Sequence, residues 1–206
     1  MLDPDLDLCS PRCLYTSPAP MAIEPEAAHP HQVLATMRDG WQQLEAPVAR
    51  DVATLGRDLL NEPQVLCDAL ARFPHTLVHG GPKRQNVGLE RDGQQHIVRL
   101  DWQLAAHAPP AVDLAWLLSQ FAPILPFGID AAIEHYRAGL ARRLGARFSE
   151  RWWRPQLELG RLGHFLRQAC FWLQRIAYRE SASVHEQQRT LLTTWTGWVR
   201  AGTAWL

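Results

Sequence analysis

Apolar residues recur at three- and four-residue spacing over most of the chain, which is typical of helices with one buried face. Before position 75 this spacing predicts three helices. The first covers about 31–44, and the other two begin near Pro47 and Pro63. We expect Asp130 to cap a later helix at its start and Gly145 to end it. After position 110 the pattern predicts four helices in all, over about 112–121, 130–144, 150–179 and 183–204.

The helical spacing is interrupted in the middle of the chain by three short, β-prone segments at 76–78, 87–89 and 96–100. Between the last two, residues 91–94 form a hairpin signal in which Gly93 can take a positive φ. The sequence therefore predicts an α+β fold in which a helical body carries a small β-hairpin.

The composition limits the number of domains and the kinds of partner that we expect for this chain. The 206 residues suffice for one domain, and the 21 basic and 21 acidic residues give a net charge of zero. A nucleic-acid-binding protein would show a basic surface, so we expect no nucleic-acid partner. Six prolines fall within the first 30 residues, so we interpret 1–30 as a Pro-rich leader or linker and 31–206 as the domain.

The sequence shows no signal for a membrane or an export pathway. The N-terminus is acidic, with Asp3, Asp5 and Asp7, which is unlike a secretory or transit signal. The longest uncharged stretch, 114–129, has fewer than 18 residues and contains two prolines, so we expect no membrane partner. We therefore predict a cytoplasmic protein.

The four cysteines are scattered, as in a protein with free thiols. Cys9 and Cys13, followed by His29 and His31, raise the alternative of a zinc site. Their spacing does not match the usual structural zinc patterns, and we favour an irregular leader.

Polar residues gather around the predicted hairpin. The loop after 76–78 contains His79 and Gly81 and ends at Asn86, where the next strand begins, while Asp101 follows the third strand. If these two strands pair antiparallel, Asn86 and Asp101 lie close together. An amide and a carboxylate oxygen suit Mg²⁺, which takes its other ligands from water and phosphate.

These residues resemble the motifs of the aminoglycoside phosphotransferase and choline-kinase-like family, which is related to the protein kinases. The family loop reads His-Gly-Asp, four residues, then Asn, and this chain has His79-Gly80-Gly81, four residues, then Asn86. The family's Asp-Trp at a strand end is matched by Asp101-Trp102, and its Asp-Leu-Ala by Asp113-Leu114-Ala115. The resemblance spans about 76–118, with the three motifs in the family order.

The resemblance implies a role for each matched residue. Asp101 and Asn86 would hold Mg²⁺ at the phosphates of ATP, and the substrate would be a small-molecule hydroxyl. His79 would brace the loop, and Asp113 would anchor it from the following helix, although Asp113 also fits a helix cap after Pro109-Pro110. The fold would be the mostly helical C-lobe of a protein-kinase-like enzyme.

Two departures from the family pattern bear on activity. Gly81 stands where the family has its catalytic Asp, so the base is lost, which typically costs about 10²–10⁴-fold in rate. Lys83 or Arg84 can neutralise charge but is no base at neutral pH. Lys83 is also the only lysine in the chain, and the residues before His79 contain no Gly-rich strand pair. We therefore expect the ATP-clamping N-lobe to be absent.

Three hypotheses about function follow. The first is a degenerate phosphotransferase that is weakly active or inactive as an isolated chain. The second is an active ATP-dependent phosphotransferase whose N-lobe is supplied elsewhere, for example by another chain. The third is a pseudokinase that binds a ligand or partner without catalysis.

Overall fold

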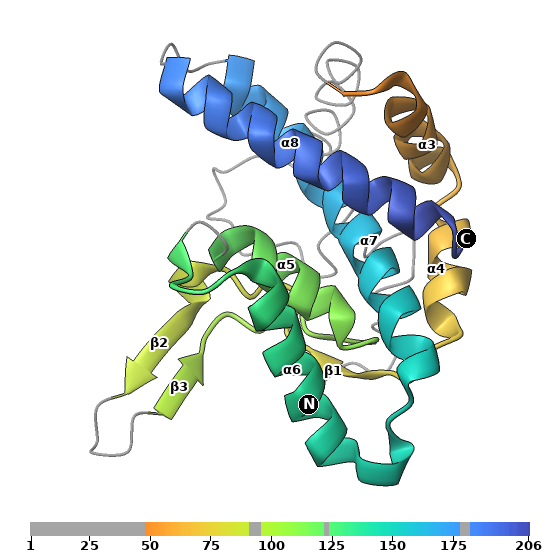
Figure 1. The fold of residues 1–206 in the computed structure, drawn as a ribbon, viewed down its shortest axis with the longest axis vertical. Coiled ribbons are helices and arrows are strands. Elements are labelled where there is room, and N and C mark those ends of the chain that lie inside the picture. Colours follow the sequence, from red (N-terminus) through yellow and green to blue (C-terminus); the bar gives the residue numbers. More distant parts are fainter. Residues whose placement is uncertain (1–47, 91–95, 122–123, 178–181) are drawn as a thin grey trace.

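The structure is a computed structural model and describes residues 48–90, 96–121, 124–177 and 182–206. In Figure 1, helix α8 crosses helix α7, and a β-hairpin projects from the helical body. The expected leader, the helix at 31–44, the zinc alternative and the hairpin turn at 91–94 lie outside the described residues.

Two helices precede the strands, as the apolar spacing predicts. Helix α3 covers Arg50–Asn61 and helix α4 covers Gln64–Ala71, with Pro63 at the N-cap position. Each buries one face, which includes Leu59 in α3 and Leu66 in α4. The prolines thus mark the starts of these helices to within a few residues.

The strands form two separate two-stranded antiparallel sheets. Strand β1, Thr76–Val78, pairs with β4, Ala106–Ala108, and strand β2, Val87–Glu90, pairs with β3, His96–Arg99. A short 3-10 helix, Arg84–Asn86, leads into β2. The hairpin and its antiparallel pairing follow the sequence prediction, but β3 ends one residue earlier than expected.

Strand β4 was not expected from the sequence. Its residues, Ala-His-Ala, have little β propensity of their own, so no local pattern marks them as a strand. Ala106 and Ala108 are buried against Val78 of β1, and this packing with the ladder to β1 makes the segment a strand. Tertiary contact therefore decides the conformation here.

Four long helices complete the fold: α5 Ala111–Phe121, α6 Ile129–Leu144, α7 Glu150–Ala177 and α8 Ala182–Thr203, with a 3-10 turn at Gly145–Arg147. The prediction that Asp130 caps α6 is wrong, because Gly128 occupies the N-cap and Asp130 lies in the first turn. A carboxylate there still interacts favourably with the helix dipole. Gly145 ends α6 at φ +53°, as expected.

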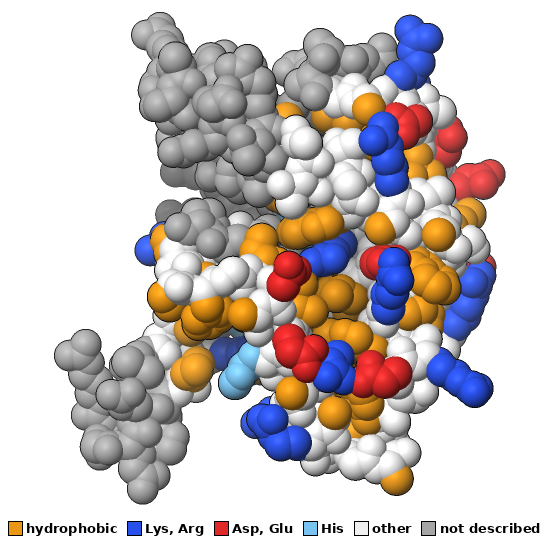
Figure 2. Space-filling model, viewed as in Figure 1, with side chains coloured by type: hydrophobic (Ala, Val, Ile, Leu, Met, Phe, Trp, Pro, Cys, Tyr) orange, Lys and Arg blue, Asp and Glu red, His pale blue; other side chains and the backbone are white. Residues whose placement is uncertain are grey.

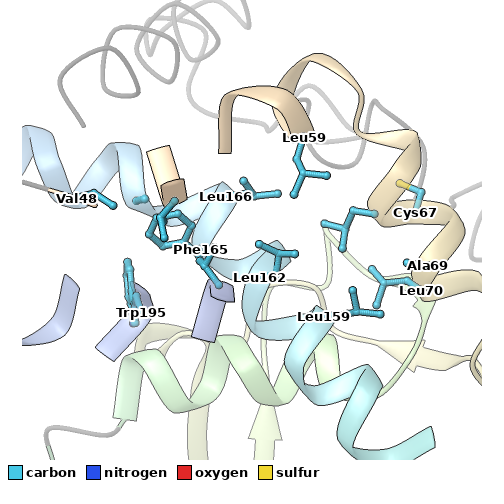
Figure 3. Packing of buried hydrophobic residues seen from close by; sticks show 14 of the residues in the cluster. Val48, Leu59, Cys67, Ala69, Leu70, Leu159, Leu162, Phe165, Leu166 and Trp195 are labelled. Atoms are coloured by element: carbon cyan, nitrogen blue, oxygen red, sulfur yellow. The ribbon is translucent and has the colours of Figure 1, made fainter. Parts of the chain in front are cut away.

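The largest core cluster lies where α7 meets α3, α4 and α8 (Figure 3). Its buried members from α7 and α8 include Leu159, Phe165 and Trp195. A second cluster joins α5 to the start of α7, and it buries Leu114 and Leu118 as expected for a central helix. Helix α7 thus connects the two clusters, and α5 is held where its first turn can meet the loop after β1.

Acidic and basic side chains lie side by side over α6 and the start of α7 (Figure 2). Arg137 pairs there with Glu134 on its own helix and with Glu150 on the next. The carboxylates of both pairs are exposed, so each pair contributes little to stability. Among the described helices none is long and apolar enough to span a membrane. The α+β class and the mostly helical body are confirmed.

Candidate active site

The loop after β1 turns sharply inside the protein. His79 is 1 % exposed, and Gly80, Gly81 and Pro82 are buried with it. Gly80 has φ +74°, a conformation that glycine adopts without strain. A Cβ at Gly80 would lie 1.9 Å from the carbonyl oxygen of Leu104, so only glycine fits at this position.

Asp113 holds this loop from the first turn of α5. Its two carboxylate oxygens accept hydrogen bonds from the backbone N–H of His79, at 2.7 Å, and of Gly80, at 2.9 Å. Bonds from an N–H to an ionised carboxylate are among the stronger hydrogen bonds in proteins. The carboxylate is thus committed to the loop.

Two further side chains, Arg99 and Tyr136, interact electrostatically with Asp113. The Arg99 guanidinium of β3 lies 3.6 Å from a carboxylate oxygen of Asp113. The phenol of Tyr136, on α6, is partly buried and donates to the carbonyl of Pro110 at 3.4 Å. Burial, together with the nearby negative charge of Asp113, raises the pKa of Tyr136 to about 12, so this phenol stays protonated at neutral pH.

His79 joins the loop to the segment after β3. Its Nδ1 accepts from the N–H of Gly81 at 3.3 Å, and its Nε2 lies 2.8 Å from the carbonyl oxygen of Leu100. A carbonyl oxygen only accepts, so the ring proton lies on Nε2. The ring also packs against Trp102, with centroids 4.7 Å apart. His79 therefore ties Gly81 to the residues that flank Asp101.

Asn86 and Asp101 meet where the hairpin joins the body. The pairing of Val87 with Arg99 brings them together, and the backbone N–H of Leu100 donates to the Asn86 carbonyl at 2.9 Å. The Asn86 Nδ2 donates to Gly81 O at 3.0 Å and to Asp101 Oδ2 at 3.1 Å.

The backbone of Asp101 is strained. It has φ +62°, which is unfavourable by about 1–2 kcal/mol for a residue other than glycine. Strain of this kind is concentrated at functional sites, where the surrounding contacts hold it.

Two oxygen atoms of this pair suit a hard cation. The Asn86 amide uses its nitrogen for both hydrogen bonds, so Asn86 Oδ1 and the second carboxylate oxygen of Asp101 remain available as metal ligands. In the described part of the chain no three His, Cys, Asp or Glu residues form a metal-binding group. Two protein oxygens are enough for Mg²⁺ when phosphate and water complete the shell, so the residues fit Mg²⁺ bound to a nucleotide.

Gly81 offers only backbone atoms to this site. Its carbonyl accepts from Asn86 Nδ2 and from the backbone N–H of Lys83, at 2.8 Å. The side chains of Lys83 and Arg84 are exposed beside the loop. The structure thus links His79, Gly81, Asn86, Asp101 and Asp113 through direct hydrogen bonds, and it leaves the Lys83 side chain at the surface.

Sequence reasoning missed three residues of this region: Arg99, Leu104 and Tyr136. Leu104, in the segment before β4, lies against the loop, whereas Arg99 of β3 and Tyr136 of α6 interact with Asp113. Tertiary packing brings all three to this region. The one usable signal was the Gly80-Gly81 pair, because adjacent buried glycines indicate a close backbone approach by another segment.

The two glycines should respond differently to the same substitution. Gly80→Ala places a methyl group against Leu104 O and forces a positive φ, so we expect a loss of at least 1–2 kcal/mol in the free energy of unfolding, about the penalty for φ alone. In Gly81→Ala the new Cβ meets only the Leu104 side chain, at 3.4 Å, so the change should be small. Urea unfolding of both variants tests this difference, and equal losses would contradict it.

One comparison with known proteins matches the region that contains this site. The model of the phosphotransferase enzyme family matches residues 21–155, which is well over half of the chain and includes every residue of the site. No curated protein and no solved structure matches the chain. The match agrees with the family recognised from the three motifs, and the chain therefore belongs to the phosphotransferase enzyme family.

Proposed function

We propose that this protein binds Mg²⁺·ATP at Asn86 and Asp101 but transfers the phosphoryl group weakly or not at all. The observation that carries the proposal is the hydrogen bond from Asn86 to Asp101 directly beside Gly81. It joins a suitable pair of oxygen ligands to a loop in which the base position has no side chain.

Each residue of the site would have its own role in binding a nucleotide. Mg²⁺ bound with ATP would neutralise phosphate charge, which is the main chemical contribution of the metal in phosphoryl transfer. Asn86 and Asp101 would supply protein oxygens for it, and the exposed Lys83 ammonium can approach a phosphate oxygen. Asp113 and His79 hold the loop backbone in place.

Transfer to an acceptor hydroxyl needs a group that takes up its proton. Gly81 has no such group, and the ring nitrogens of the buried His79 are engaged with Leu100 and Gly81. The loss of a general base typically lowers the rate by about 10²–10⁴-fold. The site therefore favours nucleotide binding over turnover.

We also propose that residues 1–75 of this chain do not form the nucleotide clamp of the kinases. The sequence holds one lysine, Lys83, so no lysine among those residues is available to pair with the nucleotide phosphates. The described residues before β1 contain the helices α3 and α4 and no strand. A clamp supplied by another chain would convert the protein into an active phosphotransferase on a small-molecule hydroxyl.

Thermal unfolding with and without nucleotide tests the proposal. At 100 times Kd, Mg²⁺·ATP stabilises by about 2.7 kcal/mol, which corresponds to a rise in Tm of about 5–10 °C for a chain of this size. We expect this rise in the wild type, its loss when EDTA removes the metal, and its loss in Asp101→Ala. Asp58→Ala, an exposed acid on α3, is the matched control and should keep the full rise.

ATP turnover separates the three hypotheses about function. We expect only background hydrolysis and transfer when hydroxylated acceptors are added. Robust turnover that Asp101→Ala abolishes would show an active enzyme and overturn the proposed low activity. The absence of any Mg²⁺·ATP effect on Tm would overturn nucleotide binding and leave a binding module for another ligand.

A further inference from the structure

Two histidines meet on the outer face of the sheet that β1 forms with β4. His107 lies in β4, directly opposite Leu77 of β1, and His75 lies just before β1. The centroids of the two imidazole rings are 5.0 Å apart, with 67° between the ring planes. Ala106 and Ala108 are buried on the opposite face of β4, whereas His107 and Leu77 are exposed. The two rings therefore lie together on a face that solvent reaches.

The distance between the rings suits two ligands of one metal ion. A Zn²⁺ ion binds an imidazole nitrogen at about 2.0–2.1 Å, which puts the ring centroid about 3.2 Å from the ion. Two rings on one ion then have centroids about 4.5 Å apart at a right angle and about 5.2 Å apart at the tetrahedral angle. The observed separation of 5.0 Å lies between these values. Because the rings come from paired strands, the ladder fixes how far apart they can lie.

The ring nitrogens of this pair include one that has no other use. His75 Nε2 is buried and has no hydrogen-bond partner among the described residues. A buried polar atom without a partner costs free energy, and a metal ion that accepts the nitrogen lone pair would remove this cost. The described residues add no third His, Cys, Asp or Glu to the pair, so water would complete the shell. Imidazole ligands of this kind suit Zn²⁺, Ni²⁺ or Cu²⁺ and not Mg²⁺.

From this geometry we propose that His75 and His107 bind a divalent transition-metal ion such as Zn²⁺, which joins β1 to β4. Strand β1 leads directly into His79, and β4 precedes α5, whose Asp113 accepts the hydrogen bonds of the loop after β1. An ion across the two strands would therefore stabilise the segments that carry the loop and its anchor. This inference goes beyond the proposed function, and it uses neither of the proposed Mg²⁺ ligands.

Thermal unfolding with Zn²⁺ alone, in the absence of nucleotide, tests the proposal. At ten times Kd the unfolding equilibrium constant falls about elevenfold, which corresponds to a rise in Tm of about 3–6 °C for a chain of this size. We expect this rise in the wild type, its reversal by EDTA, and its loss in both His75→Ala and His107→Ala. His135→Ala, which removes an exposed histidine of α6, is the matched control and should keep the full rise. Mg²⁺ at the same concentration should leave Tm unchanged.

A third imidazole on the same face should strengthen the site. Leu77 is 51 % exposed and is the register partner of His107, so Leu77→His adds a nitrogen ligand beside the pair. We expect this variant to bind Zn²⁺ at least tenfold more tightly than the wild type, as measured by competition with a zinc-binding dye. Thr76→His is the matched control, because successive residues of a strand point to opposite faces. Its affinity for Zn²⁺ should equal that of the wild type.

Three results would overturn the metal site. If Zn²⁺ does not raise the Tm of the wild type, the two rings only pack edge to face. If either His75→Ala or His107→Ala keeps the full rise, the ion is bound elsewhere or by one histidine alone. Equal affinities of Leu77→His and Thr76→His for Zn²⁺ would show that the face of His107 holds no ion. Nucleotide is absent from all these measurements, so their outcome is independent of the proposed Mg²⁺·ATP binding.

Discussion

Asp113→Ala is expected to lower the free energy of unfolding by about 2–5 kcal/mol and to abolish the stabilisation by Mg²⁺·ATP. The substitution removes the acceptor for the backbone N–H groups of His79 and Gly80. Each buried donor left without a partner costs about 1–3 kcal/mol. Because the same loop carries Gly81 O, to which Asn86 donates, its release should also disorganise the pair of oxygen ligands.

Urea unfolding followed by fluorescence measures this loss. Asp113→Asn keeps one acceptor oxygen, so its loss should be about half as large. Asp58→Ala, at an exposed site on α3, should change stability by less than about 0.5 kcal/mol. Arg99→Met tests the contribution of the ion pair between Arg99 and Asp113. It should change the free energy of unfolding by less than about 1 kcal/mol, because the charged atoms are 3.6 Å apart and the pair is partly exposed. A loss in Asp113→Ala no larger than that of Asp58→Ala would show that the loop does not depend on Asp113.

Lowering the pH is expected to destabilise the protein through His164. This side chain is buried between Trp116 of α5 and Trp195 of α8, with ring centroids 5.7 and 5.6 Å away. Neither ring nitrogen has a hydrogen-bond partner. Burial, and secondly the positive charge of Arg167, lowers the pKa of His164 from 6.5 to about 3.

The direction in which stability changes with pH is set by proton binding at His164. Between pH 6.5 and about 3 the unfolded chain binds a proton at His164 and the folded protein does not, so stability falls as the pH falls. At 1.36 kcal/mol per pH unit, the loss should reach about 2–3 kcal/mol by pH 4.5. Above pH 6.5 this group makes no pH-dependent contribution.

His164→Phe should remove this part of the acid sensitivity. A phenylalanine ring carries no proton and leaves no unpartnered nitrogen, so stability at pH 7 should stay equal or rise. Urea midpoints from pH 7.5 to 4.5 should therefore fall less in His164→Phe than in the wild type. The control is His135→Phe, at an exposed position on α6, and its pH profile should follow the wild type. Identical slopes for His164→Phe and the wild type would refute this assignment.

Local patterns predicted the elements that are stabilised mainly by their own residues. The helix spacing around Leu114 and Leu118 gave a buried central helix, and Gly145 marked the end of α6. Strand β4 escaped prediction because its alanines become a strand only by pairing with β1. The N-cap of α6 was misassigned to Asp130, since two residues with cap preferences lie close together and the chain path selects Gly128.

At the site, the sequence by itself determined which chemical groups are present. Antiparallel pairing of two adjacent strands was enough to bring Asn86 to Asp101, because a hairpin is a local structure whose register follows from its turn. The glycine at position 81 and the presence of a single lysine are likewise sequence properties.

Only the tertiary structure decided what surrounds those groups. The bonds from Asp113 cross more than 30 residues of sequence to reach His79 and Gly80, and the Leu104 backbone approaches Gly80 closely from a segment with no periodic pattern of its own. Such contacts depend on how α5 and β4 are placed by the core, which no local spacing encodes. The sequence therefore determined which groups the loop carries, and the tertiary packing decided how Asp113 and the turn at 103–104 hold that loop in place.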